Sequence, residues 1–517
     1  MSTSWLKNSV FYEVYPQSFY DSNSDGIGDL RGIALKLDYI RELGCNALWI
    51  NPIYDSPFMD AGYDVRDYKK IAPRYGTEDD FKHLLDEAHK RGMKILLDLV
   101  PGHTSDTHEW FKAAKTGYPS EYDNRYIFTK SVWDAPPEYR LMCGVCERDG
   151  NYLVNYFSSQ PALNYGFHEV KYPAWQFSAD SPEAWETVEA LKDIMRFWLD
   201  KGIDGFRVDM ADSLVKNDDE KISTAKIWRD IRLMMDADYP DAVLISEWSN
   251  PLRAIVNSGF HADFYLDHQG NGYNSLFRKR FGDGDNLSFF ADHAHGDIEE
   301  FLADYTPAYL CSREHGYISF ITNNHDMPRA PFYMSDEIIR LSHAFMMTMP
   351  GVPFVYYGDE IGMIYRTDLV SKEGGFSRTG SRTPMQWDHT KNLGFSDADE
   401  DMLYLPVDNR PEAPTVENQA GVQGSIYENL KALIALRKEF PELSNDSEFE
   451  IVYAKSHDYP FAYRRGSFVA FVNPSDDDRT IEYRMDGAEV AYTIGDWSAD
   501  ENTVTINARS FLLIKHS

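Results

Sequence analysis

The strongest constraint on the fold is an alternation of short apolar runs with amphipathic stretches. Eight runs rich in β-branched and aromatic residues are VFYEVYP (10–16), ALWINPI (47–53), KILLDLV (94–100), GFRVDMA (205–211), VLISEW (243–248), DFYLDHQ (263–269), ISFITNNHD (318–326) and VPFVYYGDE (352–360). Between them, stretches such as TEDDFKHLLDEAHKRG place apolar residues at three- and four-residue spacing, as amphipathic helices do. Alternating strands and helices predict parallel βαβ units, and eight strands favour a closed (β/α)8 TIM barrel over an open sheet.

Two segments interrupt this alternation. Residues 104–177 are rich in Tyr, Pro and Asn without helical periodicity, which predicts a small inserted domain after the third strand. After about residue 444, alternating strand patterns such as FVAFVN predict a C-terminal antiparallel β-sandwich. We therefore expect a barrel of residues 1–103 and 178–444, an inserted domain B of residues 104–177 and a β-sandwich domain of residues 445–517.

Charge and composition narrow the class of ligand. The chain has 83 acidic and 51 basic residues, a formal net charge of −32, which disfavours nucleic acid and anionic lipid as partners. We see no secretory signal and no apolar run of about 18 residues that would span a membrane. Four cysteines in 517 residues make no disulfide framework, and the pair Cys143 and Cys146 is interpreted as reduced structural thiols. These features indicate a cytoplasmic protein with a neutral or cationic ligand, which we expect to be a small oligosaccharide bound by a monomer or homodimer.

The stretch DSNSDGIGD (21–29) has the pattern of a calcium loop. Oxygen-bearing side chains alternate along it and glycines permit it to bend, which suits a hard cation. An EF-hand would need a glutamate at its twelfth position, where this chain has Gly32, so a calcium sensor is disfavoured. The open alternatives are one structural calcium ion inside a larger fold or a solvated acidic turn.

Three carboxylates lie at the predicted C-terminal ends of strands four, five and seven. They are Asp209, Glu247 and Asp326, and the reactive groups of a TIM barrel gather at this end. Glycoside hydrolysis needs such a set, with one carboxylate attacking or stabilising the sugar cation and one carboxylic acid protonating the leaving oxygen. A neighbouring negative charge raises the pKa of the acid and keeps it protonated near neutrality. Carboxylates that merely cap helices are the alternative.

Several motifs carry a family resemblance. The stretches DLVPGHTS (98–105), GFRVDMADS (205–213), ISEWSNP (245–251) and NNHDMPR (323–329) resemble, in order and spacing, the four signature regions of the α-amylase superfamily, glycoside hydrolase family 13. SQPALN (159–164) resembles its fifth region. GYDVRDY (62–68), SRTPMQWD (381–388) and DSNSDGIGDLRGI (21–33) look like segments of its α-glucosidase and oligo-α-1,6-glucosidase branch. The resemblance covers about residues 5–440.

The resemblance implies a role for each matching residue in the double-displacement reaction. Asp209 would be the nucleophile, Glu247 the general acid/base, and Asp326 a carboxylate that grips sugar hydroxyls. Arg207 would orient Asp209 and keep it ionised.

The resemblance also implies a closed substrate pocket. His103 and His325 would donate hydrogen bonds to the sugar, Tyr63 would stack under its ring and Phe157 would line the same subsite. Asp64 and Arg382 would pair around the terminal hydroxyl and close the pocket. The implied activity is that of an exo-acting α-glucosidase on short oligosaccharides.

The same resemblance implies one structural calcium ion in the loop after the first strand. Its ligands would be Asp21, Asn23, Asp25, the carbonyl of Ile27, and Asp29.

The sequence departs from the family pattern at several positions. Gly102 stands where Asn is usual, Ala162 where Asp is usual, and Met210 follows the nucleophile in place of the residues that mark linkage preference. Linkage preference therefore stays open. A glucosyltransferase or isomerase with the same covalent intermediate is the main alternative, and a non-catalytic binding protein is disfavoured because all three carboxylates are present.

Overall fold

The core of the molecule is a closed barrel of eight parallel strands, as the alternation predicts. The computed structural model describes residues 4–266, 271–279, 286–293 and 296–517. The barrel strands are β1 (Phe11–Val14), β2 (Ala47–Ile50), β5 (Lys94–Leu99), β8 (Gly205–Val208), β9 (Val243–Ser246), β10 (Ala262–Phe264), β11 (Tyr317–Phe320) and β12 (Val352–Tyr356). They follow one another in chain order, and β1 pairs with β12 to close the ring.

The strands are shorter than the apolar runs that predicted them. The run 318–326, for example, contains only the last three residues of β11, and its remainder is a loop. Residues 267–269 of the run 263–269 lie outside the described residues. The described residues of each run that follow its strand belong to the loops at the C-terminal ends of the strands, where polar side chains gather.

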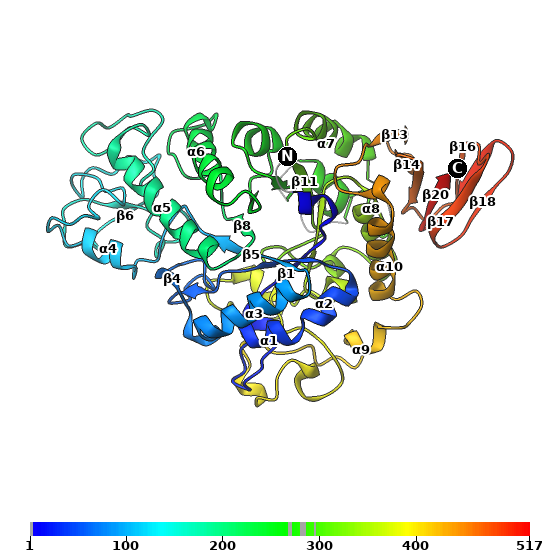
Figure 1. Cartoon of the computed structure of the whole chain (residues 1–517), viewed down its shortest axis with the longest axis horizontal. Helices are drawn as coiled ribbons and strands as arrows, with labels where there is room; N and C mark the ends of the chain where they lie inside the picture. The colour runs from blue at the N-terminus through cyan, green and yellow to red at the C-terminus, as the bar shows by residue number, and fades with distance from the viewer. Residues whose placement is uncertain (1–3, 267–270, 280–285, 294–295) are drawn as a thin grey trace.

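Helices surround the barrel (Figure 1). They are α1 (Leu30–Leu35), α2 (Leu37–Leu43), α3 (Glu78–Lys90), α5 (Pro182–Asp200), α6 (Ile222–Asp238), α7 (Ile298–Ser312), α8 (Asp336–Thr348) and α10 (Ile426–Glu439), with a short α9 (Val416–Gln419) between α8 and α10. Helix α3 begins directly after Thr77, because Thr77 and Asp80 form a reciprocal capping box. No helix of the described chain is long and apolar enough to cross a membrane.

Aromatic rings fill part of the barrel interior. Trp49 of β2 lies 5.3 Å from Phe264, and Phe264 lies 4.6 Å from Phe354, measured between ring centroids. Phe11 of β1 stacks on Phe354 at 4.4 Å. The indole N–H of Trp49 donates to Asp98 at 2.8 Å, so the apolar packing ends directly beneath the polar groups at the C-terminal end of the strands.

The segment between β5 and α5 forms the protrusion at the left of Figure 1. It contains α4 (Glu109–Ala114) and the hairpin β6 (Leu141–Met142) with β7 (Tyr152–Leu153). A separate apolar cluster holds it together, made of Ile127, Leu153, Ala162, Phe167 and Trp175. The exact domain boundaries expected from the sequence stay a prediction.

The C-terminal segment forms two antiparallel sheets at the right of Figure 1. The larger sheet contains β13 (Glu450–Tyr453), β14 (Phe461–Arg465), β15 (Phe468–Asn473), β20 (Ser510–His516) and β17 (Ala488–Ile494). The smaller contains β16 (Arg479–Glu482), β19 (Thr503–Ile506) and β18 (Trp497–Ala499). Phe471 and Leu512 of the first share one buried cluster with Ile481 and Val504 of the second, so the sheets pack face to face.

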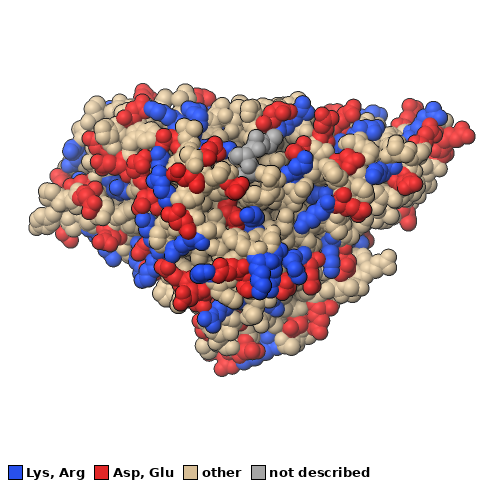
Figure 2. Space-filling view, in the orientation of Figure 1, with Lys and Arg blue, Asp and Glu red and all other residues tan. Residues whose placement is uncertain are grey.

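A further antiparallel hairpin, β3 (Tyr54–Asp55) with β4 (Asp67–Ile71), follows β2. On the face drawn in Figure 2, acidic side chains are widely spread and basic ones lie among them. The net charge of −32 is therefore not gathered in one patch on this face.

Candidate active site

A cavity of about 310 Å³ lies at the C-terminal end of the barrel strands. Its lining residues are Asp60, Tyr63, His103, Tyr156, Asp209, Met210, Glu247, Asp326 and Arg378. Five of them are among the site residues expected from the sequence. Since they come from loops after five different strands, only closure of the barrel brings them together.

Arg207 links the carboxylates on one side of this cavity. It is 1% exposed and lies opposite Asp98 in the register of β5 and β8. Its guanidinium donates to Asp98 Oδ1 at 2.7 Å and to Asp209 Oδ1 at 3.1 Å, and pairs with Glu247 Oε2 at 2.7 Å. Arg207 and Asp209 are two residues apart on one strand face, as expected, and β9 places Glu247 beside them.

This side of the cavity has three carboxylates against one guanidinium. Burial and, next, the charge of Glu247 raise the pKa of Asp209 well above its ordinary value, and Arg207 opposes them only in part. The backbone N–H of Met210 also donates to Glu247 Oε2 at 3.0 Å. The Asp209 carboxyl therefore retains a proton at a pH where an isolated aspartic acid would have lost it. Crowding of negative charge thus favours a proton on this side of the cavity, and a protonated carboxyl is what general-acid catalysis requires.

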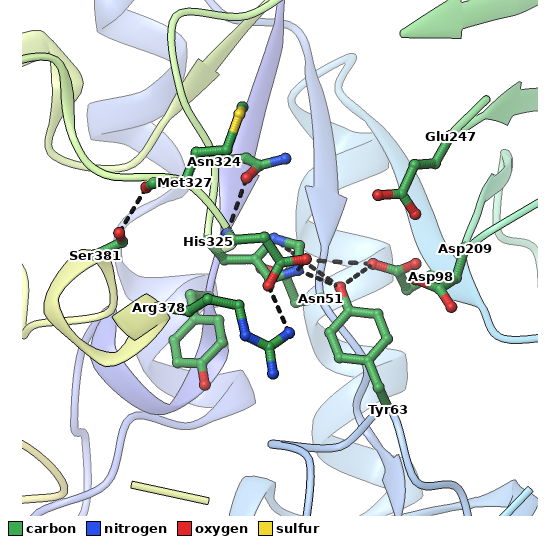
Figure 3. A network of polar contacts seen from close by, with 12 residues as sticks. Asn51, Tyr63, Asp98, Asp209, Glu247, Asn324, His325, Met327, Arg378 and Ser381 are labelled. Carbon is green, nitrogen blue, oxygen red and sulfur yellow. Dashed lines mark hydrogen bonds and ion pairs between the residues drawn. The ribbon is translucent and has the colours of Figure 1, made fainter. Parts of the chain in front are cut away.

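His325 lies behind the opposite wall of the cavity, fully buried and not itself among the lining residues (Figure 3). Its Nδ1 lies 2.7 Å from Glu13 Oε1, and its Nε2 lies 2.8 Å from the Tyr63 hydroxyl and 3.2 Å from Asp326 Oδ2. Burial disfavours a charged imidazole, but Asp326 and Glu13 outweigh it and raise the pKa of His325 to about 9. His325 is therefore an imidazolium at neutral pH and lies between the carboxylates of Glu13 and Asp326.

Asp326 is correspondingly held as an anion. Burial alone would raise its pKa, but His325, Arg378 and Arg382 outweigh burial and hold the pKa well below the ordinary value. Arg378 donates to Asp326 Oδ1 at 3.0 Å and Arg382 to the same oxygen at 2.7 Å. This carboxylate is a fixed negative charge at the cavity wall.

Glu13 is a site residue that the sequence analysis missed. It is fully buried in β1 and bonds His325, and burial raises its pKa despite that neighbour. A glutamate inside the apolar run VFYEVYP was the available signal, because a charged side chain inside a barrel strand needs a buried partner.

The expected pairing of Asp64 with Arg382 is wrong. Asp64 is fully buried behind the cavity, where it accepts hydrogen bonds from Ser56 Oγ at 3.0 Å and from the N–H groups of Met59 and Asp60 at 2.8 and 3.0 Å. Burial raises its pKa to about 6. Arg382 is 1% exposed and reaches Asp326 instead.

The pair that lies at the cavity is Asp60 with Arg378. Their side chains approach to 3.0 Å, and both line the cavity. The segments MDAGYD and SRTGSR each contain two candidates four residues apart, Asp60 or Asp64 and Arg378 or Arg382. The sequence cannot show which aspartate and which arginine line the cavity. The fold decides this, because the turn at 59–64 bonds the Asp64 carboxylate to its own N–H groups.

His103 lines the cavity as a neutral imidazole. Burial lowers its pKa to about 4, and both ring nitrogens have partners in the protein. Nε2 lies 3.0 Å from the carbonyl oxygen of Tyr63, and Nδ1 lies 3.2 Å from Asn155 Nδ2.

Phe157 lies beside the cavity wall and does not itself line it. Its ring packs against Tyr156 at 4.6 Å and Phe376 at 5.8 Å between centroids. Tyr156, which is 47% exposed, is the residue that faces the cavity.

The DSNSDGIGD loop lies apart from these groups and is shaped by its own hydrogen bonds. Asp21 accepts from the N–H groups of Asn23, Ser24 and Gly26 at 2.8–3.0 Å, and from Ser396 Oγ. Asp29 caps α1 by accepting from the N–H of Gly32 at 2.7 Å. A Cβ at Gly32 would lie 2.0 Å from the Tyr20 carbonyl oxygen, so an EF-hand glutamate has no room there.

Within the described residues, no three His, Cys, Asp or Glu side chains gather as a metal site. The buried carboxylates of the loop are satisfied by backbone N–H groups, and Asp25 is exposed. The calcium ion expected there therefore stays a prediction, and no step of the chemistry below depends on it.

The chain is similar to known proteins over most of its length. Residues 13–446 match the Alpha-amylase family, described as alpha amylase, catalytic domain. The chain is 35% identical over 479 residues to the trehalose synthase/amylase TreS of Mycolicibacterium smegmatis, covering 84% of this chain and 76% of that relative. It is 32% identical over 508 residues to a probable oligo-1,6-glucosidase of Bacillus subtilis, covering 86% of each.

A solved structure gives the same result for the fold. The trehalulose synthase MutB from Pseudomonas mesoacidophila matches with a TM-score of 0.80 at 26% identity, over 99% of both chains. The chain therefore belongs to the α-amylase family, glycoside hydrolase family 13, and is an enzyme that acts on α-glucosidic bonds.

Proposed function

We propose that this enzyme is a retaining exo-α-glucosidase that releases glucose from the non-reducing end of short α-glucosides. The observation that carries the proposal is the pairing of Asp209 and Glu247 through one buried guanidinium at the wall of a small cavity. Retaining hydrolysis needs two carboxyls at close range, one ionised and one protonated.

In the proposed reaction, Asp209 attacks the anomeric carbon while Glu247 gives its proton to the departing oxygen. The glycosidic C–O bond breaks as the ester bond to Asp209 forms, which yields a β-glucosyl ester. Glu247, now ionised, removes a proton from water as the water displaces Asp209 and yields α-glucose. Arg207 supports the ionised form of Asp209, and positive charge developing on the sugar favours that form further.

Exo-action is supported by the pair of Asp60 and Arg378. Arg378 contacts both Asp60 and Asp326 at 3.0 Å, so these three side chains form a continuous polar wall on one side of the cavity. A wall of paired charges suits the hydroxyl groups of a terminal glucose and leaves little room for a chain that continues past it. Long internal chains should be poor substrates.

A glucosyltransferase or isomerase is the second candidate, because relatives of both kinds match. TreS is a trehalose synthase/amylase and MutB a trehalulose synthase, whereas the Bacillus subtilis relative is a probable oligo-1,6-glucosidase. The covalent intermediate would be the same, and only the acceptor would differ: water in one case and a sugar hydroxyl in the other.

Product analysis separates the candidates. The enzyme is incubated with maltose, isomaltose, sucrose and trehalose, and products are followed by chromatography and proton NMR. Free α-glucose as the first sugar supports the exo-α-glucosidase, and a rearranged disaccharide supports the transferase. Initial β-glucose would rule out Asp209 as a nucleophile, and loss of iodine staining from starch before glucose appears would contradict exo-action.

A further inference from the structure

A neighbouring side chain, and not the backbone conformation, excludes a larger residue at Gly102. Its φ lies outside the left-handed region, so its conformation would admit a side chain. A Cβ at this position, however, would lie 2.5 Å from Asn155 Nδ2 and 3.0 Å from Ser213 Oγ. The space beside the backbone at 102 is therefore occupied by an amide that comes from the inserted segment, just after β7.

The contacts of that amide fix which way it faces. Lys216 Nζ donates to Asn155 Oδ1 at 3.3 Å and is itself anchored on the carbonyl oxygen of Ser213 at 2.6 Å. Because Asn155 Oδ1 faces the Lys216 ammonium, Asn155 Nδ2 faces the other way. It lies 3.2 Å from His103 Nδ1 and 3.4 Å from Ser213 Oγ. An amide nitrogen can only donate, so the Nδ1 of His103 must be the acceptor.

The direction of this chain of hydrogen bonds determines the tautomer of His103. With Nδ1 accepting, the ring proton lies on Nε2 and is donated to the carbonyl oxygen of Tyr63, which also lines the cavity. The low pKa of His103, about 4, agrees with a ring that stays neutral. The relay thus runs in one sense, from Lys216 through Asn155 and His103 to Tyr63.

We propose that Asn155 is a positioning residue of the active site, which orients His103 and fixes its tautomer from the inserted segment, and that glycine at 102 makes room for it. The proposal rests on the proposed function in that activity on α-glucosides is one of its readouts. It makes the inserted segment part of the site beyond the wall residue Tyr156.

The geometry allows the amide to be moved from one segment to the other. In an asparagine side chain Cβ and Nδ2 lie about 2.4 Å apart, as standard bond lengths dictate. This matches the 2.5 Å between a Cβ at 102 and the present Nδ2 of Asn155. An asparagine side chain introduced at 102 can therefore place its nitrogen where the present one lies, provided that the side chain of Asn155 is removed.

The test is a double-mutant cycle. Asn155→Ala should lower kcat/KM on an aryl α-glucoside about tenfold, because a misplaced group at the sugar loses favourable orientation. Gly102→Asn alone should also lose activity, since two amides compete for one space. The double variant Gly102→Asn/Asn155→Ala should return to within about threefold of wild type. Unchanged activity in Asn155→Ala, or losses that multiply in the double variant, would overturn the proposal.

A second variant keeps the test decisive if Gly102→Asn does not fold. Asn155→Asp preserves size and gains a partner in Lys216, but it cannot donate to His103. It should lose activity as Asn155→Ala does; full activity would show that only packing matters. The matched control is Asn217→Gly, which removes another amide between the insertion and the loop after β8, bonded to Glu169 and Tyr139, without contact to His103. Its kcat/KM should stay at the wild-type value, and a tenfold loss would overturn the proposal.

The tautomer provides a readout that does not need activity. In ¹⁵N spectra of histidine-labelled enzyme, the signals lost in His103→Gln identify the ring. They should show an unprotonated Nδ1 in wild type and a protonated or mixed Nδ1 in Asn155→Ala and Asn155→Asp. A wild-type ring protonated at Nδ1 contradicts the inference, whereas an enzyme inactive on every α-glucoside but with this tautomer would contradict only the proposed function.

Discussion

The two sides of the cavity hold their carboxylates in opposite ways. On the side of β8 and β9, three carboxylates share Arg207, and burial with mutual repulsion raises the pKa of Asp209. On the side of β11, Asp326 contacts an imidazolium and two guanidiniums, which lower its pKa although Glu13 and Asp60 share two of these cations.

The difference shows how one cavity can keep both a mobile proton and a permanent charge. Excess negative charge retains a proton that can be transferred, which the proposed catalysis by Asp209 and Glu247 would require. Neighbouring positive charge keeps Asp326 ionised, and in the proposed reaction this anion would bind hydroxyls and stabilise a sugar cation. The same residue type serves two purposes because its neighbours differ.

Removing the nucleophile should have the largest effect. Asp209→Asn is expected to lower kcat at least about 10⁴-fold on every substrate, because no other group can form the ester. Steady-state kinetics on maltose and on an aryl α-glucoside measure it. Retention of even a hundredth of the activity on either would assign the nucleophile elsewhere.

Removing the acid should be selective. Glu247→Gln is expected to lose about 10²–10⁴-fold on maltose and less on an aryl glucoside, whose leaving group needs little protonation. Added azide should restore turnover and give β-glucosyl azide, because an anion needs no general base. Asp326→Asn is the matched control, since it should lose activity that azide does not restore. Equal losses on both substrates, without azide rescue, would contradict the role of Glu247.

The cation-rich side can be weakened through Arg378. Arg378→Ala should raise KM and lower kcat/KM about 10²-fold, because Asp60 and Asp326 both lose a partner at 3.0 Å and the wall of the pocket opens. Asp60→Asn should act in the same direction. Asp64→Asn, by contrast, should lower the melting temperature while KM changes little, since Asp64 bonds only its own turn. A large rise in KM for Asp64→Asn, with little change for Asp60→Asn, would support the pairing of Asp64 with Arg382 and contradict the structure.

The imidazolium between the two carboxylates predicts a pH dependence of stability. The folded pKa of His325, about 9, lies above the ordinary 6.5. The ionised His325 therefore contributes fully to the free energy of unfolding below about pH 6.5. This contribution is lost as the pH rises through 9, and for a shift of this size the loss is about 3 kcal/mol. Glu13→Gln removes one carboxylate and should flatten this slope. Urea unfolding at pH 6 to 9 measures it, and identical slopes in the two proteins would refute the role of Glu13.

The smallest effect is expected far from both sides, in the DSNSDGIGD loop. If the loop binds calcium, chelation should lower the melting temperature by a few degrees and leave the rate at 25 °C nearly unchanged. Asp25→Ala should abolish this sensitivity. A melting temperature that is the same with chelator and with saturating calcium would show that the hydrogen bonds of the loop suffice.

The sequence alone determined the barrel and much of the carboxylate set. Strand and helix periodicities are local, so the eight runs could be recognised without knowledge of the fold. The C-terminal end of a barrel strand is a defined place, which is why Asp209, Glu247 and Asp326 could be assigned to one site. Arg207 could be placed beside Asp209 because residues two apart on a strand share a face.

Only the tertiary structure decided which charges meet. Asp60 and Asp64, or Arg378 and Arg382, are equivalent in sequence. The structure separates them because the turn at 59–64 bonds the Asp64 carboxylate to its own N–H groups, whereas Asp60 and Arg378 line the cavity. Glu13 approaches a histidine 312 positions away. Through-space electrostatics depends on distance and burial, and neither is encoded in local spacing.

The position of Asn155 was likewise decided only by the tertiary structure. Its amide fills the space left by Gly102, 53 positions earlier, and no periodicity links the two. Local sequence sets where strands end and which residue types stand there. The partners that fix protonation states and tautomers were set by the closure of the barrel and the docking of the inserted segment, because a proton responds to whichever charges surround it in space.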